Sequence, residues 1–164
     1  MKKQCMVLLV ENNAGVLARV ASLFVQRGFN IDSLTVSPTH DERVSRITIM
    51  TNGDEKTFSQ IMKQTSKLVE TKLIFSVEPT FSLIHEILLI KFAAEERHNE
   101  KLKGLITIYG AKVVDKTDRC MTVELTDTPQ RLDGFIEDTQ NFHVIEMCRS
   151  GAIAMERGDV TYDI

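Results

Sequence analysis

The strongest constraint on the fold is an order of predicted elements that occurs twice along the chain, once before and once after Pro79. In each half an apolar, strand-like run is followed by a helical pattern, two further strands, a second helix and a last strand. This order, β-α-β-β-α-β, is the split βαβ or ferredoxin-like arrangement. The halves share it without clear sequence identity. We therefore predict an α+β protein with two ferredoxin-like domains, 1–78 and 79–164.

The first half begins with a strand that has no polar interruption. The run 4–10 consists of Gln, Cys, Met, Val and Leu residues, which favours a central strand over a half-exposed one. The helix predicted over 15–27 places Val16, Val20 and Phe24 on one face. The other elements of this half are strands at 29–36, 44–51 and 68–77 and a helix that Asp54 begins as its N-terminal cap.

The second half repeats the pattern. Its predicted elements are strands at 84–92, 112–117, 120–126 and 144–148, a helix that ends at Gly110, a helix that begins at Thr128-Pro129, and a short extra strand within 151–158. Antiparallel sheets with both helices on one face leave the other face in need of cover, and domains of this size bury a limited core. We therefore expect a homodimer in which sheets or sheet edges pack together.

Composition excludes several classes of function. The chain has 164 residues, 43% of them apolar, and a net charge of −3. It therefore lacks the broad positive field that attracts nucleic acid. No apolar run approaches the ~20 residues that span a bilayer, and the run after the first lysines is too short for a secretory signal. We expect a cytoplasmic protein with no nucleic-acid or membrane partner.

Neither a metal site nor a catalytic site is apparent in the sequence. Cys5, Cys120 and Cys148 are odd in number and widely spaced, which argues against a disulfide framework or a zinc site. The four histidines show no ligand spacing, and no nucleophile stands at a revealing distance from a base. The common nucleotide-binding motifs are absent as well. We predict no catalytic and no metal-ligating residue.

The segment from Glu11 to Leu17 is the first candidate site. An apolar strand stops at Glu11, Asn12 and Asn13 turn the chain, and a helix begins at Gly15. The first N–H groups of a helix have no partner inside it, so this arrangement can bind a small carboxylate or phosphate. The alternative is that Asn12 or Asn13 merely caps the helix while Gly15 permits a tight turn. The residues alone leave both interpretations open.

Two further features near this segment have competing interpretations. Asn30 enters the second predicted strand near the end of the sheet, either as a binding residue at a dimer edge or as an ordinary turn asparagine. The spacing Gly15-Val16-x-x-Arg19 also occurs in acylphosphatases, on a similar frame. However, the carboxylate of Glu11 at the mouth of this loop would repel phosphate, so we disfavour a phosphatase.

The motif Val10-Glu11-Asn12-x-x-Gly15-Val16-Leu17-x-Arg19-Val20 resembles the start of an ACT domain. Its continuation, Leu23-Phe-x-x-Arg27-Gly28-Phe29-Asn30-Ile31-x-Ser33-Leu34-Thr35-Val36, is similar to the small regulatory subunit of acetohydroxyacid (acetolactate) synthase. The carboxyl half agrees more loosely, through His85 to Lys91, Thr122 to Thr126 and Arg149-Ser-Gly151. It departs at 93–103 and at Asp127, where the family usually has glycine.

The resemblance implies a regulatory role. This chain would have no catalysis and no cofactor of its own. It would activate a large catalytic subunit that carries thiamine diphosphate, FAD and a magnesium ion, and it would confer feedback inhibition by valine or another branched-chain amino acid. The effector would lie between two ACT domains of a homodimer, with the loop from one chain and Asn30 from its partner. The site residues implied are Asn12, Asn13, Ala14, Gly15, Val16, Leu17, Asn30 and Ile31. The alternative is a stand-alone ACT-type amino-acid sensor that acts on another enzyme.

Overall fold

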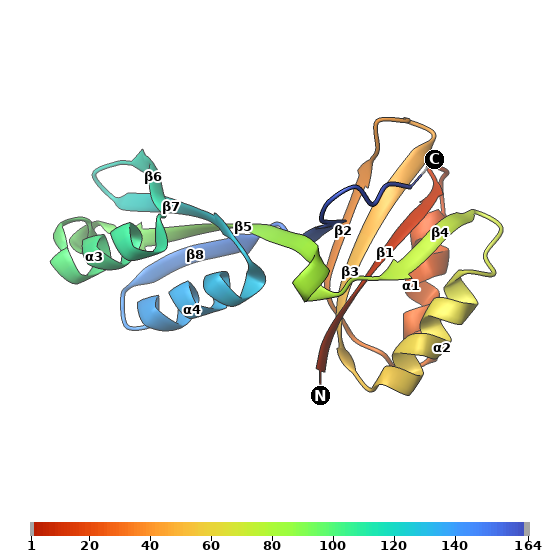
Figure 1. Cartoon of the computed structure of the whole chain (residues 1–164). Helices are drawn as coiled ribbons and strands as arrows, with labels where there is room; N and C mark the ends of the chain where they lie inside the picture. Colours follow the sequence, from red (N-terminus) through yellow and green to blue (C-terminus); the bar gives the residue numbers. More distant parts are fainter. Residues whose placement is uncertain (1, 163–164) are drawn as a thin grey trace. The chain divides into compact units, whose positions relative to one another are not determined.

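The computed structural model describes residues 2–162 and divides into two units, one up to Leu83 together with the residues from Ala152 onward, and one from Ile84 to Gly151. Figure 1 shows the elements of both units. Each unit has an antiparallel sheet with two helices, so the predicted α+β fold with two βαββαβ units is confirmed. We expected residues 79–164 to form the second domain, whereas the division assigns residues 152–162 to the first unit.

The first unit contains a four-stranded sheet in the order β2-β3-β1-β4. Its elements are β1 (Lys2–Glu11), α1 (Val16–Gln26), β2 (Ile31–Pro38), β3 (Val44–Gly53), α2 (Glu55–Thr65), β4 (Thr71–Ser76) and the 3-10 helix η1 (Pro79–Phe81). Asp54 caps α2 as predicted, because its carboxylate accepts the Thr57 N–H at 2.8 Å. Strand β4 begins later than we expected, since Leu68 still belongs to the turn that closes α2.

Helices α1 and α2 pack on one face of this sheet. Met6, Leu8 and Val10 of β1 point toward them and are fully buried, because alternate residues of a strand share a face. The predicted stripe Val16, Val20 and Phe24 supplies the α1 side of the core, and Phe58, Ile61 and Thr65 supply the α2 side.

The opposite face of this sheet is covered by the last part of the described chain. Val7 and Leu9 point to this face, yet their exposed fractions are only 0% and 2%. Residues 152–162, which we call the tail and which are dark blue in Figure 1, lie on it. Ala152 donates its N–H to Ser33 Oγ at 3.4 Å. The face for which we expected cover from a second protein copy is thus partly covered within the chain.

Arg46 is the main polar anchor of the tail. It is the cross-strand partner of Leu9, and its guanidinium donates to the carbonyl oxygen of Ala154 at 2.6 Å. The same guanidinium lies 5.8 Å from the ring centroid of Phe75. The ring of Tyr162 stacks on the same Phe75 ring, and the two ring centroids are 4.5 Å apart. The tail therefore joins the sheet through a charge-assisted hydrogen bond and ring contacts.

The second unit is built from a sheet in the order β6-β7-β5-β8, with β9 paired to β5 as well. Its helices α3 and α4 pack on one face, against Leu88, Ile90 and Phe92 of β5. The elements are β5 (Ser82–Ala93), the 3-10 helix η2 (Ala94–His98), α3 (Glu100–Tyr109), β6 (Lys112–Lys116), β7 (Cys120–Asp127), α4 (Pro129–Thr139) and β8 (Val144–Arg149). Strand β9 (Ile153–Glu156) lies in the tail and so belongs to the first unit. The expected extra strand, β9, exists, and the boundary between the units falls within β5. No helix within residues 2–162 is long and apolar enough to cross a membrane.

Arg46→Ala tests how the tail is held. Losing a hydrogen bond from a charged donor should lower the free energy of unfolding by about 2 kcal/mol, and the amides of β9 should exchange faster with solvent. Urea denaturation and hydrogen exchange measure the two effects. Arg43→Ala is the control, because the Arg43 guanidinium pairs with Asp41 in its own turn and, among residues 2–162, with no other carboxylate. Unchanged exchange in β9 would show that Arg46 does not anchor the tail.

Candidate functional site

The start of helix α1 is held by the backbone and not by an asparagine side chain. Gly15 is the N-cap residue and has φ +86°, a left-handed conformation that favours glycine. No side chain bonds the cap, and the Val16 N–H donates to the backbone oxygen of Asn13 at 3.3 Å. The alternative interpretation, in which Asn12 or Asn13 caps the helix with its side chain, is therefore wrong for this structure.

The two asparagines instead fix the loop to its surroundings. The Asn12 backbone N–H donates to the carbonyl oxygen of Arg43 at 2.8 Å, and its side-chain amide donates to that of Glu42 at 2.9 Å. The side-chain amide of Asn13 donates to Glu11 Oε2 at 3.0 Å. Within residues 2–162 the side-chain oxygens of both asparagines accept no hydrogen bond, so two polar acceptors remain available on the loop.

The turn that receives these bonds is itself ordered by one carboxylate. Asp41 accepts hydrogen bonds from the backbone N–H and the guanidinium of Arg43. These bonds, with that from the guanidinium first in effect, lower the pKa of Asp41 to about 2. The turn thus keeps its internal ion pair throughout the neutral and mildly acidic range.

Backbone N–H groups are the main donors at the loop. Among the described residues, those of Gly15, Leu17 and Ala18 have no acceptor in the chain, and all three residues are exposed. Donors at a helix N-terminus attract a small anion such as a carboxylate. The neighbouring cation, Arg19, is paired with Glu70, so its charge is already offset. The loop therefore suits a ligand that carries both a carboxylate and an ammonium group.

The predicted apolar members of the site have different environments. Val16 is only 3% exposed and belongs to the core of the first unit, so only its backbone is available to a ligand. Leu17 is 41% exposed beside the loop. Ile31 is partly buried against the core. Of the three, Leu17 alone presents a free apolar surface next to Gly15 within one chain.

Asn30 lies at the far end of the sheet from this loop. The next residue, Ile31, pairs with Thr51, which pairs with Gln4 near the start of β1, whereas the loop follows Glu11 at the end of β1. Gln4 and Glu11 are seven residues apart along β1, which corresponds to about 23 Å between the level of Ile31 and the loop. Asn30 is exposed, and its side-chain amide donates to Asp32 at 3.1 Å. One chain therefore does not bring Asn30 and the loop together.

Two carboxylates that matter here, those of Glu70 and Glu86, were not among the residues singled out from the sequence. Glu70 supports the loop twice, through its ion pair with Arg19 and through its carbonyl oxygen, which accepts the Glu11 N–H at 2.9 Å. In the second unit, Arg149 is bound to Glu86 and Asp133, so it is not free to bind an anion. Glu86 stands at a buried position of an otherwise apolar strand, which is a pattern visible in the sequence. Within residues 2–162 no group of three or more metal-ligating side chains is close enough to hold an ion.

Comparison with known proteins gives matches over nearly the whole chain. Residues 6–72 match the family of AHAS small subunit-like ACT domains. Residues 85–158 match the family described as the small subunit of acetolactate synthase. The two matches follow one another in the chain and correspond to its two β-α-β-β-α-β halves.

Full-length relatives agree with these matches. The acetolactate synthase isozyme 3 small subunit of Salmonella typhimurium is 39% identical over 96% of this chain and 97% of its own length. The chain belongs to the acetolactate synthase small subunit family. A probable acetolactate synthase small subunit of Archaeoglobus fulgidus is 38% identical over 96% of this chain and 98% of its own length. The crystal structure of the acetolactate synthase small subunit from Thermotoga maritima covers 98% of this chain and all of its own, with a TM-score of 0.86 and 34% identity.

Family membership confirms the resemblance drawn from the motifs around Gly15 and Asn30. It shows that the chain has an ACT domain of the acetolactate synthase small subunit type in its first half. The loop Asn12–Gly15 thus lies at the β1–α1 junction of that ACT domain. The eight predicted site residues all lie in the ACT match, and their role in binding stays a prediction.

Gly15→Ala tests the conformation of the loop. At φ +86° a Cβ costs about 1–2 kcal/mol, so the free energy of unfolding in urea should fall by that amount. Gly104→Ala is the matched control, because Gly104 lies inside α3 and a Cβ there meets nothing within 4 Å. There alanine should raise the stability by roughly 0.5–1 kcal/mol. Equal effects of the two substitutions would contradict a left-handed Gly15.

Proposed function

We propose that this chain is a non-catalytic regulatory subunit that raises the activity of the large catalytic subunit of acetolactate synthase and makes it sensitive to valine or another branched-chain amino acid. The observation that carries the proposal is the loop Asn12–Gly15. It presents unpaired helix N–H groups and free amide oxygens on the ACT domain of an acetolactate synthase small subunit. This role would belong to branched-chain amino acid biosynthesis in the cytoplasm.

The chemistry of an amino acid fits these groups. Its carboxylate would accept hydrogen bonds from the N–H groups of Gly15, Leu17 and Ala18. Its ammonium would donate to the side-chain oxygens of Asn12 and Asn13. An isopropyl or isobutyl side chain would need apolar neighbours, and a single methylene is worth only ~1–3 kcal/mol. Discrimination among branched-chain amino acids should therefore be modest.

A homodimer through the edge strand β2 would complete the site. Strand β2 is an edge of the sheet, whereas the outer face of that sheet is already occupied by the tail. Antiparallel pairing of β2 with its copy would set the start of one β2 beside the end of the other. Pro38, at the end of β2, pairs with Ser45, and Ser45 pairs with Val10 just before the loop. Such pairing would bring Asn30 of one protomer to the end of the sheet where the loop of its partner lies.

The cofactors of the reaction would belong to the catalytic partner. We propose that thiamine diphosphate, FAD and Mg²⁺ are bound by the large subunit and that this chain holds none of them. The regulatory effect would then be a coupling between effector binding here and activity there. Such couplings are typically ~1–3 kcal/mol and are reciprocal.

Activity of the large subunit, measured alone and with this chain, tests the proposal. We expect the complex to be more active than the large subunit alone and to be inhibited by added valine. If the chain neither stimulates the large subunit nor makes it respond to any branched-chain amino acid, the proposal is wrong. A stand-alone amino-acid sensor would also fail to co-purify with that subunit.

Two substitutions should weaken the response to valine while leaving stimulation largely intact. Gly15→Asp adds a carboxylate where the ligand carboxylate would bind, and Asn30→Ala removes a contact from the partner protomer. Loss of one hydrogen bond to a charged ligand, worth about 1.5 kcal/mol, should raise the inhibitory valine concentration roughly tenfold. Asn141→Ala, at an exposed position of the second unit, is the control. Unchanged valine sensitivity in both variants would locate the effector elsewhere.

A further inference from the structure

The chain passes between its two units twice, after Leu83 and after Gly151. Both connecting segments enter the second unit beside one carboxylate, that of Glu86. Glu86 follows the first connection by three residues, and the segment Arg149–Gly151 immediately precedes the second. The Glu86 side chain, which follows the first connection, is hydrogen-bonded to residues that precede the second.

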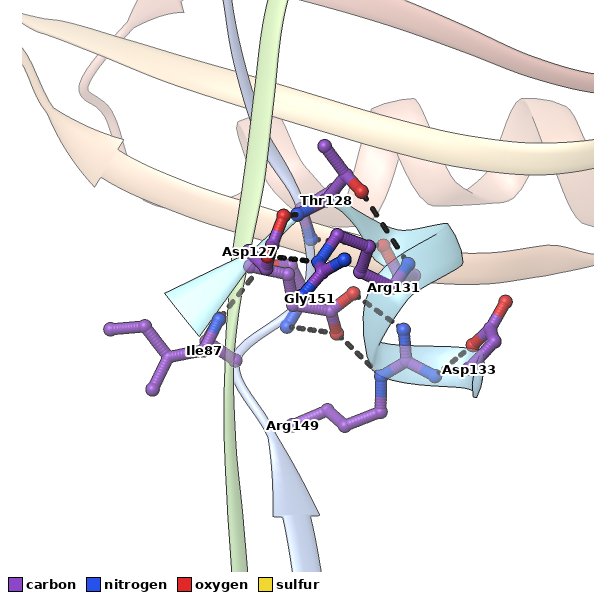
Figure 2. Close-up of polar contacts among 11 residues, drawn as sticks. Ile87, Asp127, Thr128, Arg131, Asp133, Arg149 and Gly151 are labelled. Carbon is purple, nitrogen blue, oxygen red and sulfur yellow. Dashed lines mark hydrogen bonds and ion pairs between the residues drawn. The ribbon is translucent and has the colours of Figure 1, made fainter. Parts of the chain in front are cut away.

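Glu86 is buried and fully engaged. Its residue is only 5% exposed, and its two carboxylate oxygens accept the Arg149 guanidinium at 2.8 and 2.7 Å. The Gly151 N–H donates to the same carboxylate at 3.2 Å. Figure 2 shows Arg149 reaching on to Asp133 of α4, where its second terminal nitrogen donates at 2.7 Å. The bidentate pair of Glu86 and Arg149 fixes both the distance and the orientation of the two groups, and a single hydrogen bond joins Arg149 to Asp133.

Backbone bonds next to Glu86 strengthen the same junction. The Ile87 N–H donates to Ser150 Oγ, and the Ser150 N–H donates to the Ile87 carbonyl oxygen, both at 3.0 Å. Gly151 has φ +81°, which lets the chain turn away directly after these bonds. We call the set Glu86, Ile87, Arg149, Ser150 and Gly151 the junction clamp. It ties the two connecting segments to each other and, through Asp133, to helix α4.

A neighbouring pair shows that Glu86 is not simply part of a general charge cluster. Asp127 is the cross-strand partner of Glu86, but it has its own cation, Arg131, at 2.6 Å, and it accepts the Thr128 N–H at 2.7 Å (Figure 2). Each carboxylate is thus satisfied separately. Buried ion pairs give little more stability than apolar side chains of the same volume, so stability alone does not account for an ionic clamp at this position.

We propose that the junction clamp couples the effector site of the ACT unit to the second unit, with Glu86 as the positioning residue. This inference rests on the proposed function, since it concerns how the valine response is transmitted. Energetic coupling between distant sites travels through bonded networks and rigid elements. Two connections that are bonded to each other move together, so a displacement of either in the ACT unit reaches α4 through Arg149 and Asp133. Without the clamp, the two connections would move independently.

The test uses Glu86→Gln in the full chain, with Glu146→Gln as its matched control. Glu146 pairs with Lys91 at 3.0 Å across the same β5–β8 ladder, but away from the connections. Valine affinity is measured by calorimetry for each small subunit alone and in complex with the large subunit. For the unmodified chain and for Glu146→Gln the two affinities should differ by ~5–150-fold. For Glu86→Gln they should become nearly equal, while valine binding to the free subunit and stimulation of the large subunit remain.

Each other outcome overturns the inference. An unchanged affinity ratio in Glu86→Gln means that the clamp does not transmit the response. Weaker valine binding to the free subunit, or loss of stimulation, means that Glu86 supports the site or the docking surface directly. If the unmodified chain binds valine equally well alone and in complex, the proposed function fails and this inference fails with it. If only Glu86→Gln behaves differently from expectation, the inference fails and the proposed function stands. If Glu86→Gln does not fold, the Glu86→Met, Arg149→Met double variant, which replaces the buried pair by apolar side chains, decides by the same ratio.

Discussion

The first unit depends on strand β1, which is paired along both edges and covered on both faces. It lies between β3 and β4, its inner residues pack against the helices, and its outer residues lie under the tail. A strand held on four sides has little freedom to shift, so the loop that follows it is fixed in space. The N–H groups at the start of α1 are consequently presented in one arrangement, which is what a binding site made of backbone donors requires.

Most of the fold follows from periodicity that is visible in the sequence. The uninterrupted apolar run of β1 predicted a strand buried on both faces, and Val16, Val20 and Phe24 predicted the buried side of α1. The origin of the cover on the outer face was not predictable in this way. Ala152 and Ala154 are small residues in a short segment with no marked pattern, and their hydrogen-bond partners, Ser33 and Arg46, lie more than a hundred positions earlier. Long-range partners of this kind are chosen by tertiary packing, which local preference does not encode.

The candidate site was predictable in outline and not in its bonding. A strand, a polar turn and a helix beginning at Gly15 were sufficient to indicate where an anion would bind. The sequence did not reveal that Asn12 and Asn13 would bond Glu42 and Glu11 instead of capping the helix, because asparagine has several local partners of similar energy. Glu86 carried a signal that went unused. It lies on the same face of β5 as the buried residues Leu88, Ile90 and Phe92, and a carboxylate at a buried position requires a partner.

The assignment of the tail to the first unit has a consequence for how the protein is made. During synthesis, residues 84–151 leave the ribosome before the tail does, so the second unit has its whole chain available first. In the first unit, Val7 and Leu9 stay uncovered until the last described residues have left the ribosome. Domains tend to fold in the order in which they appear, but here the earlier domain is the later one to be completed. For that interval, the newborn chain carries an apolar sheet face that either stays exposed to solvent or is shielded by another protein.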